Sequence, residues 1–192
     1  MEKVTYKIDL SDKLLQDLDK FRVTRKFTDV SIICGEDKTK FAMHRLLLCL
    51  KSEYFFNYFL KYENAESIPT EIFCKQLDSN VFKYLYDFFY NGQITLTPEN
   101  TIPIMSHCYM LQIRDLKSVI AKYLMERINY FNAGTLLDAG LKFKEKELYD
   151  YAFNFILKYA EHVILTDDFA KNVSENEFIR LLGSLLYVGS HL

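Results

Sequence analysis

The sequence predicts a mixed α/β fold: a domain of about 120 residues with a small, mainly three-stranded sheet flanked by helices, followed by a wholly helical segment. Two observations predict the first part: a β-branched, apolar run at residues 29–34 is followed by a segment at residues 40–43 that can return as a paired strand, and amphipathic helical patterns surround them. A third observation predicts the second part, because apolar residues follow helical spacing from about residue 129 onward. The change of pattern at residues 126–132 is the best candidate for a domain boundary.

The predicted sheet is built from short segments. Residues 29–34 (DVSIIC) and 40–43 (KFAM) flank the turn signal GEDK, which predicts a hairpin. Residues 71–74 (EIFC) are a further strand candidate. Residues 4–8 (VTYKI) alternate as a short strand would, ahead of the first helix.

The first predicted helix carries the most informative apolar stripe. Ser11 and Asp12 are residues that favour a helix start. The stripe that follows consists of Leu14, Leu15, Leu18 and Phe21. Full burial of each such side chain stabilises the protein by roughly 1.5–3 kcal/mol, so we expect the stripe to be covered. The chain's own core or a second copy of the chain could cover it, and the residues alone leave both open.

Spacing and capping signals predict further helices. Phe55 and Phe59 fall four residues apart on one helical face. A helix over residues 78–91 should end at Asn-Gly, because either residue tolerates the left-handed conformation of a helix end. In the helical part, Ser174-x-x-Glu177 matches a capping box. One apolar stripe there consists of Leu136, Leu137, Gly140 and Phe143.

Charge and hydropathy argue against two classes of partner. The 24 Lys and Arg residues are scattered among 26 Asp and Glu residues, giving a formal net charge of −2, so the basic patch of a nucleic-acid-binding protein is missing. No apolar run approaches the roughly 20 residues that cross a bilayer, and the charged N-terminus does not resemble a secretory signal. We therefore expect no nucleic acid and no membrane as partners, and an intracellular location in the cytoplasm and also in the nucleus.

The sequence also lacks the patterns of a catalytic or metal centre. Cys34, Cys49, Cys74 and Cys108 are far apart in apolar stretches, which predicts buried reduced thiols. A zinc site with a histidine is not supported by spacing. There is no Gly-rich phosphate loop and no nucleophile elbow. We expect no enzyme, no catalytic residue, no metal and no cofactor.

Five motifs in order resemble the BTB/POZ family, in the long form that has an extra N-terminal strand and helix. They are FTDV at residues 27–30, FAMHRLLL at 41–48, SEYF at 52–55, YDFFYNG at 86–92 and MLQIRDL at 110–116. Residues 129–189 resemble the opening of the BACK domain of Kelch-like proteins. The resemblance therefore implies a BTB/POZ domain at residues 1–126 and the N-terminal part of a BACK domain, built of helical hairpins, at residues 127–192.

The resemblance implies a two-fold homodimer, with the stripe of Leu14, Leu15, Leu18 and Phe21 in the interface. It also singles out Asp29 and Arg45, which flank the hairpin strands, as a charged pocket. A buried ion needs a partner, because its desolvation costs several kcal/mol. This pair is interpreted either as a peptide-binding groove at the dimer seam or as a buried pair that stabilises the fold.

BTB–BACK proteins of this layout are similar to substrate adaptors of cullin-3 ubiquitin ligases. The resemblance places the cullin-3 N-terminal region on the helix after the hairpin, the loop that follows and the first BACK helices. The corresponding positions are Tyr58, Phe59, Tyr62, Glu63, Tyr90 and the segment from Tyr130. Alternatively, Tyr58 and Phe59 are ordinary core or rim aromatics.

The loop departs from the pattern of cullin-binding relatives, which usually carry a hydrophobic residue two positions before a Glu. Counting without gaps gives Glu63 and Ala65, and a shift by one gives Asn64 and Glu66. The acid is then restored but the hydrophobic residue is not, and Tyr62 is the candidate substitute.

Three functions follow from the resemblance. The first is a dimeric adaptor that links an unknown substrate protein to cullin-3. The second is a scaffold or transcriptional regulator whose dimer binds a corepressor-like peptide. The third is a decoy that occupies cullin-3.

Overall fold

The computed structural model describes residues 11–189, so the strand expected at residues 4–8 lies outside the described residues. The chain forms two compact units, the first ending at Ile113 and the second beginning at Arg114. The domain boundary between residues 126 and 127 remains a prediction. No helix within the described part of the chain is long and apolar enough to span a membrane.

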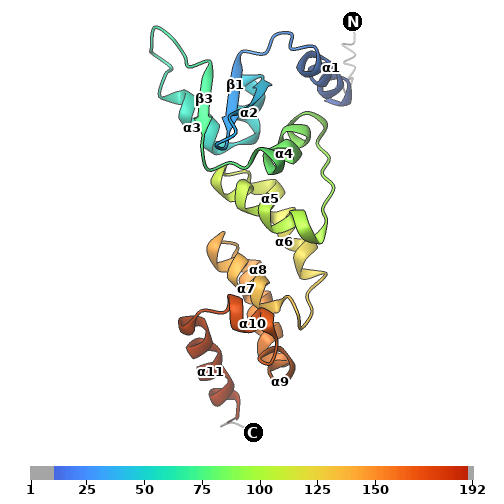
Figure 1. Ribbon diagram of the computed structural model, residues 1–192, viewed down its shortest axis with the longest axis vertical. Helices are drawn as coiled ribbons and strands as arrows, with labels where there is room; N and C mark the ends of the chain where they lie inside the picture. Colours follow the sequence, from blue (N-terminus) through green and yellow to red (C-terminus); the bar gives the residue numbers. More distant parts are fainter. Residues whose placement is uncertain (1–10, 190–192) are drawn as a thin grey trace, which may run out of the picture. The chain divides into compact units, whose positions relative to one another are not determined.

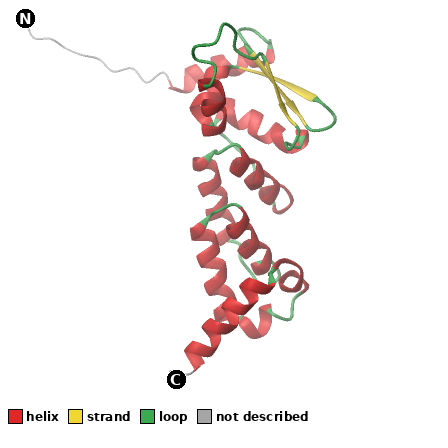
Figure 2. Ribbon diagram, turned by 90° about the vertical axis from the view of Figure 1, so that its left-hand side faces the viewer, coloured by secondary structure: helices red, strands yellow, loops and turns green. Residues whose placement is uncertain are grey.

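The first unit contains a three-stranded sheet, which confirms the predicted mixed fold. Strands β1 (Val30–Cys34) and β2 (Thr39–Met43) form the predicted antiparallel hairpin. Strand β3 (Glu71–Cys74) pairs with β1 in parallel, so the strand order is β2-β1-β3. Figure 2 draws this sheet in yellow. Gly35 has a φ of 63° after β1, a conformation that favours glycine at the turn. β1 is the central strand and four of its five residues are buried.

The first unit also contains the helices α1 to α5, which Figure 1 labels. They are α1 (Ser11–Val23), α2 (Arg45–Lys51), α3 (Glu53–Leu60), α4 (Ser79–Asn91) and α5 (Pro98–Met110). Ser52 separates α2 from α3: its hydroxyl accepts the Phe55 N–H and donates to the Leu111 carbonyl at 2.6 Å. Asp78 caps α4, and Gly92 ends it with a φ of 69°, as the Asn-Gly signal predicted.

The core of the first unit is made of large apolar side chains from the sheet, α3, α4 and α5. Among its fully buried members are Ile32, Phe55, Phe82, Leu85, Phe89, Ile104 and Met105. Phe55 and Phe59 both lie on the buried face of α3, as their spacing predicted. This core fixes α3 and the end of α5, which carry the candidate site.

The described residues of the second unit form helices joined by short turns, and none of them forms a strand. The helices are α6 (Arg114–Met125), α7 (Ala133–Lys142), α8 (Lys146–Lys158), α9 (Ala160–Val163), α10 (Asp167–Asn172) and α11 (Glu175–Gly189). Helices α7 and α8 pack most extensively. A Cβ on Gly140 would lie 2.6 Å from the Tyr149 backbone nitrogen, so the absence of a side chain permits this close approach.

A carboxylate distant in sequence caps α7. Asp168 accepts the backbone N–H groups of Gly134 at 2.7 Å and Thr135 at 3.2 Å, together with the Thr135 hydroxyl. The predicted capping box at α11 forms in one direction, because the Glu177 N–H donates to Ser174 Oγ at 3.4 Å. The Glu177 carboxylate accepts from the Tyr149 hydroxyl and so links α11 to α8.

Candidate interaction surfaces

The predicted stripe on α1 is only partly covered by its own chain. Helix α1 packs against α4, which leaves Leu15, Leu18 and Phe21 half-buried. Leu14 remains 61% exposed. Packing on the chain's own core therefore covers only part of the stripe. The side that faces α4 is covered, and the side that carries Leu14 still exposes apolar surface that a second copy of the chain could cover.

Helix α2 carries two exposed leucines that the sequence reasoning did not single out. Leu46 is 71% exposed and Leu50 is 72% exposed, one helical turn further on. The spacing of four was visible in the sequence. However, α2 is apolar at five of its seven positions, so the pattern could not show which side faces the core. Phe27, just after α1, is also exposed and packs edge to face on Phe21.

His44 and Tyr90 form a buried pair at the start of α2. The Tyr90 hydroxyl accepts the His44 backbone N–H at 3.0 Å and lies 2.8 Å from His44 Nδ1. His44 Nε2 lies 3.3 Å from the Lys26 carbonyl, which can only accept. The hydrogen bonds are therefore satisfied when Nε2 carries the proton and the hydroxyl donates to Nδ1. Burial raises the pKa of Tyr90 to about 12.

The prediction that Tyr90 is a docking residue is wrong. Its side chain is fully buried, so it cannot contact a partner on the folded chain. It lies in the last turn of α4. The sequence motif could not distinguish an aromatic anchor from an aromatic core residue, because both are large and apolar.

Asp29 and Arg45 are paired as predicted, but the pair is not buried. Asp29 Oδ1 accepts the Arg45 backbone N–H at 2.7 Å, and Arg45 Nη2 donates to the Asp29 carbonyl at 3.2 Å. The Asp29 side chain is 51% exposed, and its Oδ2 lies 4.0 Å from Arg45 Nε. The expectation of a buried charge pair therefore holds for one partner only: the Arg45 side chain is 20% exposed, whereas the Asp29 carboxylate is half-exposed at the start of α2. These contacts within the chain favour the fold-stabilising interpretation.

Phe59 is a second correction among the predicted docking residues. It is 7% exposed, and the Arg45 guanidinium lies 5.0 Å from its ring centroid. Phe59 therefore belongs to the core face of α3, as the alternative interpretation of this residue held. Tyr58, Tyr62 and Glu63 keep side-chain surface on or just after α3.

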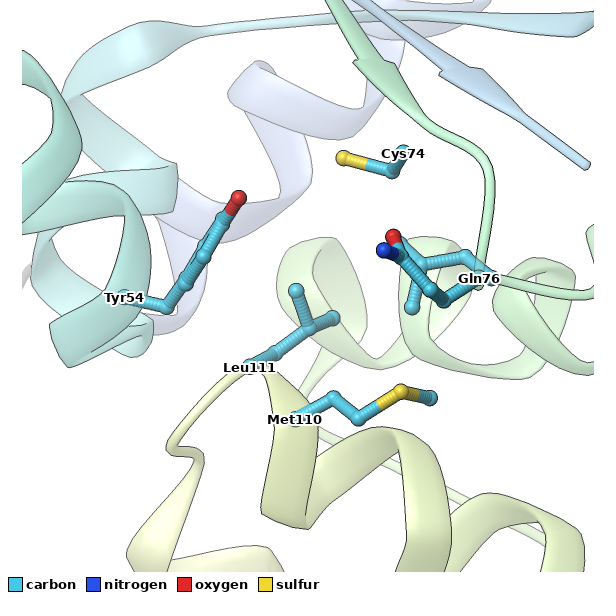
Figure 3. A pocket seen from close by; sticks show the side chains of 6 residues that line it. Tyr54, Cys74, Gln76, Met110 and Leu111 are labelled. Carbon is cyan, nitrogen blue, oxygen red and sulfur yellow. The ribbon is translucent and has the colours of Figure 1, made fainter.

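One flank of α3 lines an apolar hollow of about 340 Å³. Tyr54 faces Cys74 and Gln76 across this hollow, and Met110 and Leu111 close it from the end of α5 (Figure 3). Tyr54 and Tyr58 fall one helical turn apart, and the Tyr58 and Tyr62 rings lie 5.6 Å apart. These three tyrosines are here called the tyrosine flank: Tyr54, which lines the hollow, and Tyr58 lie on α3, and Tyr62 lies in the turn just after it. The sequence showed their spacing, but it did not show that β3 and α5 meet there.

The segment from Tyr130 gathers aromatic side chains within the second unit. The Tyr130 ring stacks on His162 at 5.1 Å and lies 5.5 Å from the Tyr159 ring. Phe131, the next residue, is 77% exposed. Aromatic side chains suit a docking surface because they bury much area with few rotatable bonds.

Cys34, Cys74 and His107 are buried in the first unit. Burial raises the pKa of the Cys34 thiol to about 12 and that of the Cys74 thiol to about 11, so both stay protonated near neutral pH. His107 Nε2 accepts the Asp78 backbone N–H at 2.9 Å. No group of three or more metal-ligating side chains occurs within residues 11–189.

A small sheet covered by helices that present exposed leucines and a tyrosine-lined hollow has the features of a protein-interaction module. Comparison with known proteins agrees. The family model of the BTB/POZ domain matches residues 18–128, and the chain belongs to this family. The predicted fold class and the resemblance are thereby confirmed.

The relatives include Kelch-like and viral proteins. Kelch-like protein 38 of Danio rerio is 30% identical over 163 residues, which are 85% of this chain and 27% of that protein. Kelch repeat and BTB domain-containing protein 1 of Cowpox virus (strain Brighton Red) is 27% identical over 90% of this chain and 30% of its own length. Kelch-like protein 25 of Homo sapiens is 26% identical over 93% of this chain and 30% of its own length.

The chain thus spans less than a third of the length of these relatives. A solved structure, the BTB domain of zebrafish PATZ1, is similar to this chain with a TM-score of 0.58 and 24% sequence identity. It covers 65% of this chain and 99% of its own, which shows the BTB fold.

Proposed function

We propose that this chain is a non-enzymatic homodimeric BTB module that binds the N-terminal region of cullin-3, as the adaptor through which a substrate protein meets a ubiquitin ligase. The observation that carries the proposal is the apolar hollow beside the tyrosine flank on α3. A cullin-3 partner would place the chain inside the cell, in the cytoplasm or the nucleus. The substrate protein is not identified by these residues.

The exposed leucines of α1 and α2 support the homodimer. Leu14, Leu46 and Leu50 each expose more than 60% of their surface. Burying such a side chain contributes roughly 1.5–3 kcal/mol, and a two-fold interface covers the same residues on both copies at once. The half-buried Leu15, Leu18 and Phe21 would form the edge of this interface, since α4 already covers part of them.

The homodimer is tested by charge at Leu14. Leu14→Glu should give a monomer in sedimentation equilibrium at about 10 µM, where the unmodified chain is a dimer, because the new carboxylate would have to be desolvated. Leu165 is 82% exposed in the second unit, so Leu165→Glu is the matched control and should leave the dimer intact. An unmodified chain that is monomeric at this concentration refutes the homodimer.

The hollow and the tyrosine flank support the cullin-3 surface. Tyr54 is 37% exposed at the rim, and the hollow is mostly apolar within, so an inserted apolar side chain of a partner would lose its water-exposed surface there. Tyr62 is the candidate substitute for the hydrophobic residue that cullin-binding relatives carry in this loop, where counting without gaps gives Glu63. Phe59 and Tyr90 are buried core residues and are not proposed as contacts.

Titration with purified cullin-3 N-terminal region tests the surface. Tyr54→Ala and Tyr62→Ala should each weaken binding by about tenfold or more, since central interface aromatics typically contribute over 1 kcal/mol. Phe73 is 69% exposed, yet it points to the opposite face of β3 from Cys74. Phe73→Ala is therefore the control and should bind normally.

The same titration separates the alternatives. No binding at about 50 µM would reject both the adaptor and the decoy and would favour a scaffold that binds a corepressor-like peptide. Tight binding without recruitment of any substrate by the full-length protein would favour the decoy.

A further inference from the structure

Arg22 connects α1 to α4 through a set of contacts that no sequence motif predicted. Its side chain is 13% exposed, and Nη1 donates to Asp87 Oδ1 at 2.7 Å. Nη2 forms an ion pair with Asp19 Oδ1 at 2.6 Å. The guanidinium lies over the rings of Tyr86 and Tyr90, at 4.4 Å and 5.0 Å from their centroids. These five residues are here called the Arg22 cluster.

The Arg22 cluster is connected to α2 and back to the end of α1. The Tyr90 ring that lies under Arg22 carries the hydroxyl that binds His44, the residue before α2. The His44 ring in turn contacts the Lys26 carbonyl, three residues after α1 ends. The contacts therefore form a closed loop from α1 to α4, from α4 to the start of α2, and from there to the segment that follows α1.

This loop fixes two helices that carry exposed leucines. Leu14 lies on α1, and Leu46 and Leu50 lie on α2, so the shape of the combined apolar surface depends on how the two helices are held. The apolar side chains by which α1 packs on α4, Leu15, Leu18 and Phe21, are only half-buried. The Arg22 guanidinium makes a partly buried, charge-assisted hydrogen bond and also lies over two aromatic rings. Together these interactions are strong enough to hold such a helix.

We propose that Arg22 is a positioning residue for dimerisation: it holds α1 against α4 and thereby sets the apolar face of α1 and α2 that a second copy of the chain recognises. The inference rests on the proposed homodimer and adds a residue that lies behind the interface rather than in it. Its loss should loosen α1 while the sheet and the apolar core of the first unit remain folded.

The test compares two ways of breaking the cluster with a matched arginine elsewhere. Arg22→Met keeps the length of the side chain but removes its charge and its planar face. Asp87→Asn keeps the size of the partner and removes its charge. Arg127→Met is the control, because Arg127 also lies over a tyrosine, at 3.9 Å from the Tyr123 ring centroid, but only four residues away in sequence.

Two measurements are needed. Hydrogen exchange of the α1 amides reports how firmly α1 is held, and sedimentation equilibrium reports the dimer dissociation constant. Arg22→Met and Asp87→Asn should each speed exchange in residues 13–23 by about tenfold or more, with exchange in β1 unchanged. Both should raise the dissociation constant by about tenfold, and Arg127→Met should change neither quantity.

The outcomes separate this inference from the proposed homodimer. A dimeric parent chain whose dissociation constant is unchanged in both variants overturns the positioning role, whether or not α1 exchange changes. A parent chain that is monomeric overturns the homodimer, and the positioning role with it. If Arg22→Met does not fold, Asp87→Asn decides the result, since the Asp87 side chain is half-exposed and the variant retains the Arg22 side chain.

Discussion

The two units hold their helices in place by partly different means. In the first unit, polar side chains far apart in sequence connect the elements: the His44 and Tyr90 pair spans 46 residues, and Ser52 reaches the Leu111 carbonyl across 59. In the second unit, α7 and α8 come together at a glycine, and a distant carboxylate caps α7. Long-range polar contacts thus hold helices in both units, and the second unit adds a close backbone approach that only glycine permits.

This contrast explains which sequence predictions failed. The failed predictions, Tyr90 and Phe59 as docking residues and a buried pair of Asp29 and Arg45, all concern the first unit. In that unit an aromatic ring can pack in the core while its polar group forms a hydrogen bond, as the Tyr90 ring and hydroxyl do. Residue type alone therefore does not show whether a side chain is exposed. In the second unit, helical spacing largely determined which side chains are buried.

The largest expected effect tests the close approach in the second unit. Gly140→Ala should lower the free energy of unfolding by about 3 kcal/mol, because the new Cβ would meet the Tyr149 backbone, which cannot give way cheaply. Urea denaturation measures the change. The control is Gly183→Ala in α11, where no atom lies within 4 Å of the new Cβ. That variant should be up to about 1 kcal/mol more stable, since alanine favours a helix over glycine.

The next effect tests the polar network of the first unit. Tyr90→Phe should lower the free energy of unfolding by about 2 kcal/mol, because the buried His44 N–H and Nδ1 would both lose their partner. Tyr62→Phe should change it by less than about 0.5 kcal/mol. Thermal denaturation measures both. Equal stability of the two variants would show that the network contributes little.

A smaller effect is expected at the α7 cap. Asp168→Ala should lower the free energy of unfolding by about 1.5 kcal/mol, because the Gly134 and Thr135 N–H groups would lose their acceptor. Asp167 has a 95% exposed side chain, so Asp167→Ala is the matched control and should be nearly neutral. Chemical denaturation followed by circular dichroism distinguishes them. A destabilised Asp167→Ala would point to a general charge effect at α10.

The smallest expected effect is a pH dependence in the first unit. Burial lowers the pKa of His107 below its usual 6.5, and its Nε2 must stay unprotonated to accept the Asp78 N–H. The unfolded chain binds this proton more readily than the folded chain does. The contribution of His107 to the free energy of unfolding is therefore fully present above about pH 6.5, and it decreases as the pH drops below that value.

Urea midpoints at about pH 7.5 and about pH 5.5 measure this change, and His107→Gln should reduce the difference between them. His162 is mostly exposed, so His162→Gln is the control and should keep the slope of the unmodified chain. An unaltered slope in His107→Gln would assign the pH dependence to other groups.

The amino-acid sequence by itself determined the local structure. The hairpin of β1 and β2, the ends of α4 at Asp78 and Gly92, and the apolar face of α3 all follow from residue spacing and capping, which act over a few residues. The order of short motifs also carried the BTB/POZ resemblance that the family match confirmed.

Only the tertiary structure decided which side chains remain available to a partner. Leu46 and Leu50 are exposed while Leu47 and Leu48 are buried, and the hollow beside Tyr54 exists because β3 and the end of α5 meet there. Exposure depends on which elements, distant in sequence, cover a side chain. Local patterns state only that a side chain is apolar, and they do not state what packs on it.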